Sequence, residues 1–501
     1  MSASTEPALG RFEGTATVFL TSAASLIVEI VAGRMLAPYV GMSLYTWTSV
    51  IAVVLAGLSL GHWIGGWATD RLKGSKRIFL AAILLGASAS TLAAIAILPG
   101  ISGFVLTRLD TAVTGITALT LSAFFIPSVA AGIPSPLVAA AFVEANPETR
   151  GRALGGLFAA GAIGSIVGTL SAGYLFISWL GSTKTLIACA GLYALLALVI
   201  GAQAGRKAGI ASLAVVLALG AAGYGLRGAA KFCDVESRYF CIRSIDISAQ
   251  AGERAQLMVL DHLAHSMSSR DNPESLLWPY PYMSDAIARA EKGEDFSAFF
   301  IGGGAFSLPR AWAARGIDTT VAEIDPEVTA MAEREFWFDP ATTRVIHRDA
   351  RIALKDEPAE SFDVIVGDAF TDVAVPPHLV TKEFAALVAS RLKPDGIYIL
   401  HFVAPSSRPE ALYAMKKTLK TAFTRTDMWL DGSPIYPDSR RSFLFVARKT
   451  DTEPTMGANG TWHPLDSAEI DRRAAASDAR VLSDDYAPID RLVGMAGIGV
   501  D

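Results

Sequence analysis

Three glycines and several carboxylates stand where apolar segments end in the second half of the chain. Gly302, Gly303 and Gly304 follow the apolar run FSAFFI and precede a helical segment. Glycine at such a turn lets a ligand approach the backbone beside the positive end of a helix. Glu323 ends the next apolar run, about 20 residues further on, where a carboxylate can accept hydrogen bonds from ribose hydroxyls. These residue types and their spacing predict a nucleoside site.

Two aspartates follow the next two apolar segments. Asp349 comes after the run RVIH, and Asp368 ends the run FDVIVG. In an open α/β sheet, ligands bind in the crevice outside the carboxyl ends of the strands. The glycines, Glu323, Asp349 and Asp368 are therefore expected to line one crevice. The alternative is a set of solvated acids at strand ends that take no part in chemistry.

The elements that would position these residues alternate between strand and helix. Helices are expected at SLPRAWAARG, with Ser307 as the N-cap, at PEVTAMAEREF and at TKEFAALVASRL, and strands at DTTVAEID, IYILHFV and SFLFVARK. Before them, residues 238–248 and 255–261 alternate well enough for a β-hairpin. Such alternation predicts a mostly parallel sheet with helices on both faces.

The first half of the chain has a different composition. The whole sequence is 51% hydrophobic and 18% charged, but charges are scarce between residues 14 and 226. A helix needs about 20 apolar residues to cross a hydrocarbon core. Spans are predicted near 14–36, 43–67, 78–100, 113–143, 153–180, 185–205 and 209–227. We therefore predict a transmembrane helical domain over residues 1–230, with about seven or eight spans, and a soluble domain over residues 231–501.

The side of the membrane on which the soluble half lies is ambiguous. The basic loops around Arg71, Arg150 and Arg206 should face the cytoplasm. With seven spans, this places the soluble half outside, whereas a domain that uses a cytosolic nucleotide should lie inside. An eighth crossing would remove the conflict. Cys233 and Cys241 would form a disulfide outside and remain thiols inside.

The bulk charge and the cysteines exclude two further classes of partner. The net charge of −5 argues against a nucleic-acid binder, which needs a basic face. The three cysteines lack the spacing and partners of a zinc site, so no metal is expected. The remaining partners are the lipid bilayer and a small molecule. A homo-oligomer is compatible with the sequence, which does not give the oligomeric state.

Several segments resemble one known family. FFIGGGAFSLPR, VAEIDPEV, HRDARIAL and FDVIVGDAFTD are similar to the signature blocks of spermidine synthases, the polyamine aminopropyltransferases. LSLGHWIGGWATDRLKG and VLSDDYAPIDRL resemble the bacterial fusions of transmembrane helices to such a domain. The resemblance implies a Rossmann-like domain of the class I methyltransferase type. It also implies a multi-pass protein of the bacterial inner membrane, and we expect the soluble domain in the cytoplasm.

The resemblance also assigns residues to a donor site. The implied co-substrate is decarboxylated S-adenosylmethionine or S-adenosylmethionine itself. Gly302–Gly304 would lie against its thioether and ribose, and Glu323 would hold the ribose hydroxyls. Asp349 and Ala350 would meet the adenine. His265 stands where the family has a donor-contacting glutamine, although a loop histidine without a task is the alternative.

The acceptor side resembles the family less closely. Asp368 would be the catalytic acid, and Asp372 would be the family's second aspartate, displaced by one position. The aspartate that grips the donor's amino group in the family is Ala305 here, and a glutamine is replaced by Phe240. The family's Tyr-His-Glu reads as residues 280–282, Tyr-Pro-Tyr. Because a polycation needs carboxylates to replace its water, these changes disfavour a polyamine acceptor.

These observations lead to two functional hypotheses. The first is a membrane-bound transferase that moves an alkyl group of the aminopropyl type to an amine or amphiphilic acceptor and does not carry out standard spermidine synthesis. The second is a transporter or sensor whose soluble domain binds a sulfonium nucleoside without turnover. Product formation that depends on Asp368 would separate them.

Overall fold

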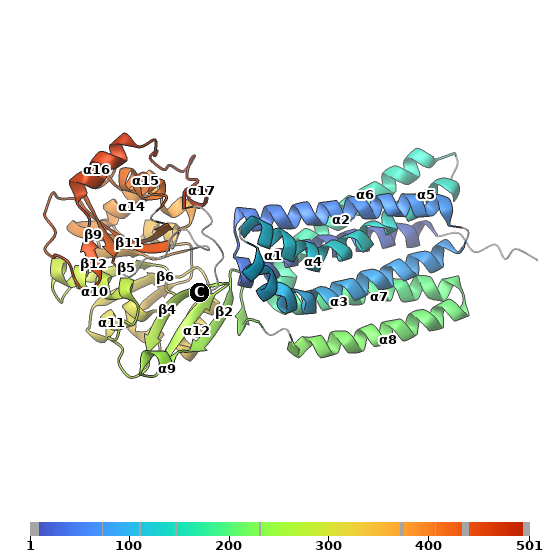
Figure 1. Ribbon diagram of the computed structural model, residues 1–501, viewed down its shortest axis with the longest axis horizontal. Coiled ribbons are helices and arrows are strands. Elements are labelled where there is room, and N and C mark those ends of the chain that lie inside the picture. The colour runs from blue at the N-terminus through green and yellow to red at the C-terminus, as the bar shows by residue number, and fades with distance from the viewer. Residues whose placement is uncertain are drawn as a thin grey trace, which may run out of the picture. The chain divides into compact units, whose positions relative to one another are not determined.

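The computed structural model describes residues 10–72, 74–109, 112–145, 148–229, 232–370, 375–405, 407–432 and 440–493. These residues belong to two compact units. The first contains the chain up to Phe232 together with residues 236–238, and the second contains residues 233–235 and the chain from Tyr239 onward. Figure 1 shows long helices in the first unit and a sheet flanked by helices in the second.

The first unit is built from long apolar helices. They are α1 (Arg11–Val40), α2 (Leu44–Arg71), α3 (Lys76–Arg108), α4 (Ala112–Gly132), α5 (Pro134–Ala145), α6 (Arg150–Ser171), the π-helical turn η1 (Ala172–Phe176), α7 (Ile177–Ala204) and α8 (Arg206–Ala229). When contiguous pieces are joined, six helices among the described residues are long and apolar enough to cross a membrane. This confirms the helical region expected in the first half of the chain, and its composition is that of a multi-pass membrane protein.

The longest of the six helices is broken at Gly181. The run from Arg150 to Ala204 has 55 residues. As one straight helix it would be about 80 Å long, far more than the roughly 30 Å of a hydrocarbon core. Gly181 leaves the helical conformation with φ +75° and ψ 171°. The Glu236 carboxylate accepts a hydrogen bond at 2.8 Å from the backbone N–H of Ser182, where the next helical segment begins. The six helices therefore contain seven segments of membrane-spanning length.

Glycines in these helices allow close backbone packing. A Cβ atom added at Gly61 on α2 would collide with the backbone oxygen of Val129 on α4. A Cβ atom at Gly164 on α6 would collide with that of Phe19 on α1. Small residues at helix contacts are typical of membrane helix bundles. Gly61 and Gly164 thus serve the packing of this unit.

The second unit contains a small sheet with the strand order β1-β2-β3-β4. Its strands are β1 (Val235–Glu236), β2 (Cys241–Asp246), β3 (Ala255–Leu260) and β4 (Leu263–Ser269), with the short helix α9 (Ser248–Ala251) between β2 and β3. The predicted hairpin is present as the antiparallel pair β2 and β3. The sequence did not predict β4, which pairs with β3 in antiparallel fashion.

The large sheet of the second unit has eight strands in the order β12-β10-β11-β9-β8-β5-β6-β7. In chain order, its elements are α10 (Pro279–Lys292), β5 (Ser297–Ile301), α11 (Ser307–Ala314), β6 (Asp318–Ala322), α12 (Pro326–Glu335), η2 (Pro340–Thr342), β7 (Arg344–Ile346), α13 (Ala350–Asp356), β8 (Phe362–Gly367), η3 (Pro377–Leu379), α14 (Lys382–Arg391), β9 (Leu392–Pro405), α15 (Glu410–Leu419), β10 (Arg425–Asp431), β11 (Arg440–Arg448), β12 (Trp462–Pro464), α16 (Ser467–Ala476) and α17 (Ile489–Val493).

The strand order of this sheet reverses direction between β5 and β8. Strands β5, β6 and β7 pair in parallel toward one edge, and β8 pairs in parallel with the other side of β5. Strand β9 continues in parallel from β8, whereas β11, β10 and β12 are antiparallel. A reversal of this kind opens a crevice at the carboxyl ends of the strands. The predicted Rossmann-like fold is therefore confirmed.

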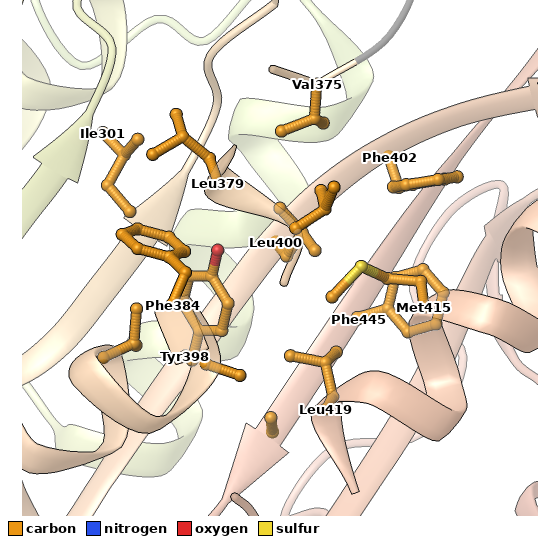
Figure 2. Packing of buried hydrophobic residues seen from close by; sticks show 14 of the residues in the cluster. Ile301, Val375, Leu379, Phe384, Tyr398, Leu400, Phe402, Met415, Leu419 and Phe445 are labelled. Atoms are coloured by element: carbon orange, nitrogen blue, oxygen red, sulfur yellow. The ribbon is translucent and has the colours of Figure 1, made fainter. Parts of the chain in front are cut away.

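Buried side chains cover both faces of the large sheet. Because neighbouring strand residues point to opposite faces, Phe299 packs into one apolar cluster and Phe300 into the other. In the first cluster, Phe384 from α14, Leu400 from β9 and Met415 from α15 lie together (Figure 2). The continuous apolar run of β5 is thus buried from both sides, which holds the glycine turn that follows it on a rigid base.

The three cysteines differ in state. Cys233 and Cys241 form a disulfide with a Cα–Cα distance of 5.2 Å. Cys189 is a buried free thiol. Disulfides persist in oxidising compartments. A disulfide at this point is therefore compatible with a soluble half that lies outside the cytoplasm, as the basic loops indicate. It does not fit the cytoplasmic placement that a nucleotide site would suggest.

We predict that Cys233 and Cys241 are oxidised in cells that express the full chain. In a Cys189→Ser background, membranes are blocked with N-ethylmaleimide, reduced, and then labelled with a polyethylene-glycol maleimide. Two added tags are expected after reduction and none without it. A Cys241→Ser control leaves one blockable thiol and should give no tag after reduction. Two tags on unblocked, unreduced protein would contradict the bond.

Candidate active site

A cavity of about 480 Å³ opens at the carboxyl ends of β5, β6 and β8. Ligand sites for small molecules typically have a volume of this order. Its lining includes every predicted site residue that the structure describes, namely Gly302, Gly303, Gly304, Glu323, Asp349, Ala350, Asp368 and His265. Asp372 lies outside the described residues. The structure therefore brings the separate sequence segments together around one space.

The glycine turn after β5 depends on the absence of side chains. Gly302 and Gly304 have φ values of +94° and +53°, a region that glycine adopts without steric cost. A Cβ atom on Gly302 would lie 2.5 Å from the backbone oxygen of Asp368. The turn thus packs directly against the end of β8, which brings the two sides of the crevice together.

Helix α11 begins differently from the prediction. Phe306, not Ser307, occupies the N-cap position, with a left-handed φ of +54°. Its buried ring stacks on Phe338 with a centroid distance of 4.1 Å and lies where a Cβ atom of Gly303 would be. The expected Ser307 cap is therefore wrong, because burial of the Phe306 ring fixes the chain one residue earlier.

Glu323 links the glycine turn to the end of β6. Its Oε2 atom accepts a hydrogen bond from the backbone N–H of Gly303 at 2.8 Å, and its Oε1 atom accepts one from that of Asp325 at 2.9 Å. Burial raises the pKa of the Glu323 carboxyl, and the backbone donors oppose this effect. The carboxylate also lines the cavity, where its oxygens can accept hydrogen bonds from a ligand.

Asp349 has two partners of its own. Its Oδ1 atom caps α13 by accepting a hydrogen bond from Ile352 N at 3.1 Å, and its Oδ2 atom lies 2.7 Å from Nε2 of His378. Ala350 is the buried first residue of α13. His378 also lines the cavity. His378 was not predicted from the sequence, because the segment between β8 and α14 in which it lies has no periodic pattern of apolar residues.

Asp368 is the centre of a hydrogen-bond network on the other side of the cavity. Its Oδ2 atom accepts from the Tyr280 hydroxyl at 2.6 Å, and its Oδ1 atom lies 2.9 Å from Nδ1 of His401. Nε2 of His401 lies 3.2 Å from Oγ of Ser442. Burial, followed by the nearby Asp368 carboxylate, raises the pKa of the Tyr280 hydroxyl well above its ordinary value. Tyr280 therefore remains a donor to Asp368.

Stacking and strand geometry hold this network in place. The rings of Tyr280 and His401 stack with a centroid distance of 3.8 Å and an interplanar angle of 9°. Tyr280 belongs to α10 and His401 to β9, while Ser442 belongs to β11. From the sequence, Tyr280 was identified only as part of the Tyr-Pro-Tyr that stands in place of the family's Tyr-His-Glu, and His401 and Ser442 were not singled out. The one available signal was a histidine within the otherwise apolar run IYILHFV.

His265 lies on β4 and not in a loop, so the alternative that placed it in a loop is wrong. Its role stays a prediction. Burial lowers the pKa of His265 to about 4, although the Asp368 carboxylate acts in the opposite direction. The imidazole is therefore neutral near pH 7. The walls around it are mainly apolar and aromatic, and include Phe240, Leu263, Trp278 and Phe370.

Charged groups are few in this cavity. Three of its described lining residues are acidic, namely Glu323, Asp349 and Asp368, and Arg440 is a cation on the same lining. Among the described residues, no group of three or more His, Cys, Asp or Glu side chains is placed to hold a metal ion. The site thus combines a hydrogen-bonding turn on one side with an aromatic wall and a buried polar network on the other.

Comparisons with known proteins find a family model that matches part of the chain. The Spermine/spermidine synthase domain model matches residues 317–454. The chain is 30% identical over 172 residues to the polyamine aminopropyltransferase of Vibrio vulnificus (strain CMCP6), and the aligned stretch covers 33% of this chain and 54% of that protein. It is 31% identical over 168 residues to the N-terminal histidine N-methyltransferase of Emericella nidulans, and this stretch covers 32% of this chain and 29% of that protein.

A third relative is similar over a longer stretch. The polyamine aminopropyltransferase 2 of Streptomyces coelicolor is 27% identical over 458 residues, which is 83% of this chain and 78% of that protein. A match of this length extends into the helical half. The chain spans about half the length of the Vibrio protein and less than a third of the Emericella protein.

The low pKa of His265 predicts a pH dependence of stability. Because an unfolded histidine has a pKa of about 6.5, the unfolded chain takes up a proton first as the pH falls. Stability contributed at this position is therefore complete above about pH 6.5 and is lost as the pH falls toward 4. The loss should be on the order of 1–3 kcal/mol.

Thermal unfolding of the full chain in detergent, followed by tryptophan fluorescence from pH 8 to pH 4, tests this prediction. The drop in Tm should be smaller in His265→Gln than in the wild type. His463→Gln is the matched control, because His463 is exposed on β12. Equal pH dependence of the His265→Gln variant and the wild type would show that His265 is not the group responsible.

Proposed function

Because the second half of this chain carries a domain of the spermine/spermidine synthase family, we propose that the protein is a membrane-bound transferase that uses a sulfonium nucleoside as its donor. The donor is decarboxylated S-adenosylmethionine or S-adenosylmethionine, and the group transferred is an alkyl group of the aminopropyl type. The acceptor is an amine or an amphiphilic molecule. The observation that carries the proposal is the cavity in which Glu323, held by Gly303 N, faces the glycine turn.

The donor would bind along the turn and the ends of β6 and β7. The Glu323 carboxylate lines the cavity and would accept hydrogen bonds from the vicinal hydroxyls of a ribose. Asp349 uses both of its oxygens within the protein. Asp349 would therefore contact the adenine through its remaining lone pairs. Ala350 and the neighbouring backbone would pack against the edge of the adenine ring. His265, a neutral imidazole on β4, would contact the donor from the opposite wall.

The proposed reaction is a direct displacement at the carbon next to the sulfonium. The nucleophile of the acceptor forms a bond to this carbon as the carbon–sulfur bond breaks, and the neutral thioether nucleoside leaves. The sulfonium is already a good leaving group, so alignment of the two reactants supplies much of the rate. Asp368 lies where the glycine turn meets β8 and would stabilise the cationic charge of this step.

The acceptor side supports a molecule other than a polyamine. The nearby donor side has also lost an amine partner, since Ala305, where the family holds the donor's amino group, is buried and its N–H donates to Ser266 Oγ at 2.7 Å. Both oxygens of Asp368 already accept hydrogen bonds. Arg440 adds a positive charge to the lining. A polycation would lose its water there without replacement, whereas the aromatic wall suits an apolar chain.

Two related functions remain as alternatives within this proposal. The likeness to a histidine N-methyltransferase favours S-adenosylmethionine as donor, with a methyl group transferred. The second alternative is a transporter or sensor in which nucleoside binding changes the helical unit without turnover. Ala305 favours it, since the position that would hold the donor's amino group lacks a carboxylate.

We predict that Glu323→Gln weakens nucleoside binding by roughly 10-fold or more, because the amide supplies fewer acceptor sites and disturbs the bond to Gly303. Isothermal titration calorimetry of the detergent-solubilised chain with S-adenosylmethionine, its decarboxylated form and methylthioadenosine measures the effect. Glu333→Gln is the matched control, because Glu333 is exposed on α12. Absence of binding of all three compounds to the folded wild type would end the proposal.

A further inference from the structure

Asp368 is poorly placed to take a proton from an acceptor. Its Oδ2 atom accepts from the Tyr280 hydroxyl, and its Oδ1 atom faces Nδ1 of His401. Both carboxylate oxygens of Asp368 are thus already engaged by groups of the protein. The arrangement instead resembles one in which a carboxylate orients a histidine, and the histidine transfers the proton.

His401 has the orientation that this role requires. Its Nδ1 atom lies 2.9 Å from Asp368, which places the proton of the neutral ring on Nδ1 and leaves the lone pair on Nε2. Tyr280 stacks on the face of the ring, and Phe370 packs against it edge-on at a centroid distance of 5.2 Å. These contacts prevent rotation of the imidazole, so Nε2 has a fixed direction.

A hydroxyl already occupies the position in front of Nε2. Ser442 Oγ lies 3.2 Å from this nitrogen, and both His401 and Ser442 line the cavity. A carboxylate, an imidazole and a hydroxyl in this order form the arrangement by which enzymes remove a proton from an oxygen or nitrogen nucleophile. The Ser442 hydroxyl thus marks where the nucleophilic atom of an acceptor fits.

We propose that Nε2 of His401 is the proton acceptor of the transfer reaction and that Asp368 is the residue that positions it. The inference rests on the proposed function. As the acceptor's nitrogen or oxygen bonds to the donor carbon, the carbon–sulfur bond breaks and its electron pair leaves with the thioether. The proton of the nucleophile moves to Nε2. The positive charge of the sulfonium is thereby transferred to the imidazolium, which Asp368 stabilises.

The groups around His401 come from several elements. Asp368 at the end of β8 and Tyr280 on α10 contact the ring directly. His265 on β4 and Arg440 on β11 line the same cavity. The imidazole is therefore held between fixed protein groups on one side and faces the cavity with its Nε2 edge.

The kinetic test measures release of the thioether nucleoside by the full chain, with decarboxylated S-adenosylmethionine or S-adenosylmethionine as donor and n-octylamine as acceptor. His401→Gln retains hydrogen bonding but has no basic nitrogen. It should lower kcat about 100-fold or more and leave donor affinity within about twofold. Ser442→Ala should change kcat less than tenfold, and His463→Gln should match the wild type.

A second measurement needs neither turnover nor a variant of the buried ring. Diethyl pyrocarbonate reacts with unprotonated imidazole nitrogens, and peptide mass spectrometry locates the modification. His401 of the wild type should be modified, because its Nε2 edge faces the cavity. An unmodified His401, or a His401→Gln variant that keeps its kcat within threefold, would overturn the assignment. Modified His401 without product from either donor would instead refute the proposed transfer reaction.

Discussion

The hydrogen bond between the Gly303 N–H and the Glu323 carboxylate is the constraint on which the site depends. It joins the turn after β5 to the end of β6, and the same turn packs against the backbone of Asp368 at the end of β8. Because Glu323 is buried, its charge is tolerated only while backbone donors hold it. Loss of this bond would leave a desolvated acid and a glycine turn free to adopt other conformations. The reversal of the strand order between β5 and β8 opens the crevice, and the Gly303–Glu323 hydrogen bond fixes the conformation of the turn at its base.

The opposite wall of the cavity follows a different principle. There the polar atoms satisfy one another through Tyr280, Asp368, His401 and Ser442. A network closed in this way does not need a polycation for its charge balance, which fits the aromatic lining around it. An acceptor that enters with an apolar body and a single nucleophilic atom would exchange only one of these contacts, the one that Ser442 makes. The apolar helices of the first half suggest how such a molecule could be supplied, since the bilayer dissolves amphiphilic chains.

The sequence predicted those parts of the site that directly follow a strand. This applies to the glycine turn, Glu323, Asp349 and Asp368, because each comes after an apolar run that is typical of a buried strand. His401 was not, because a single histidine inside IYILHFV has the same pattern as a core residue until β11 is placed beside β9. The strand β4 was missed because LAHSMSS lacks β-branched residues. The Ser307 cap failed because burial of the Phe306 ring, a tertiary contact, overrode a local preference. The roles of the site residues stay predictions, since the structure shows only that they share a cavity.

The proposed function requires a nucleoside above the glycine turn, with its sugar bound to one glutamate. A cryo-electron microscopy map of the full chain with methylthioadenosine would test this most directly. Density for the nucleoside is expected over Gly302–Gly304, with both ribose hydroxyls within hydrogen-bond distance of the Glu323 carboxylate. Density for the nucleoside elsewhere, or a cavity filled by side chains of the protein itself, would contradict it.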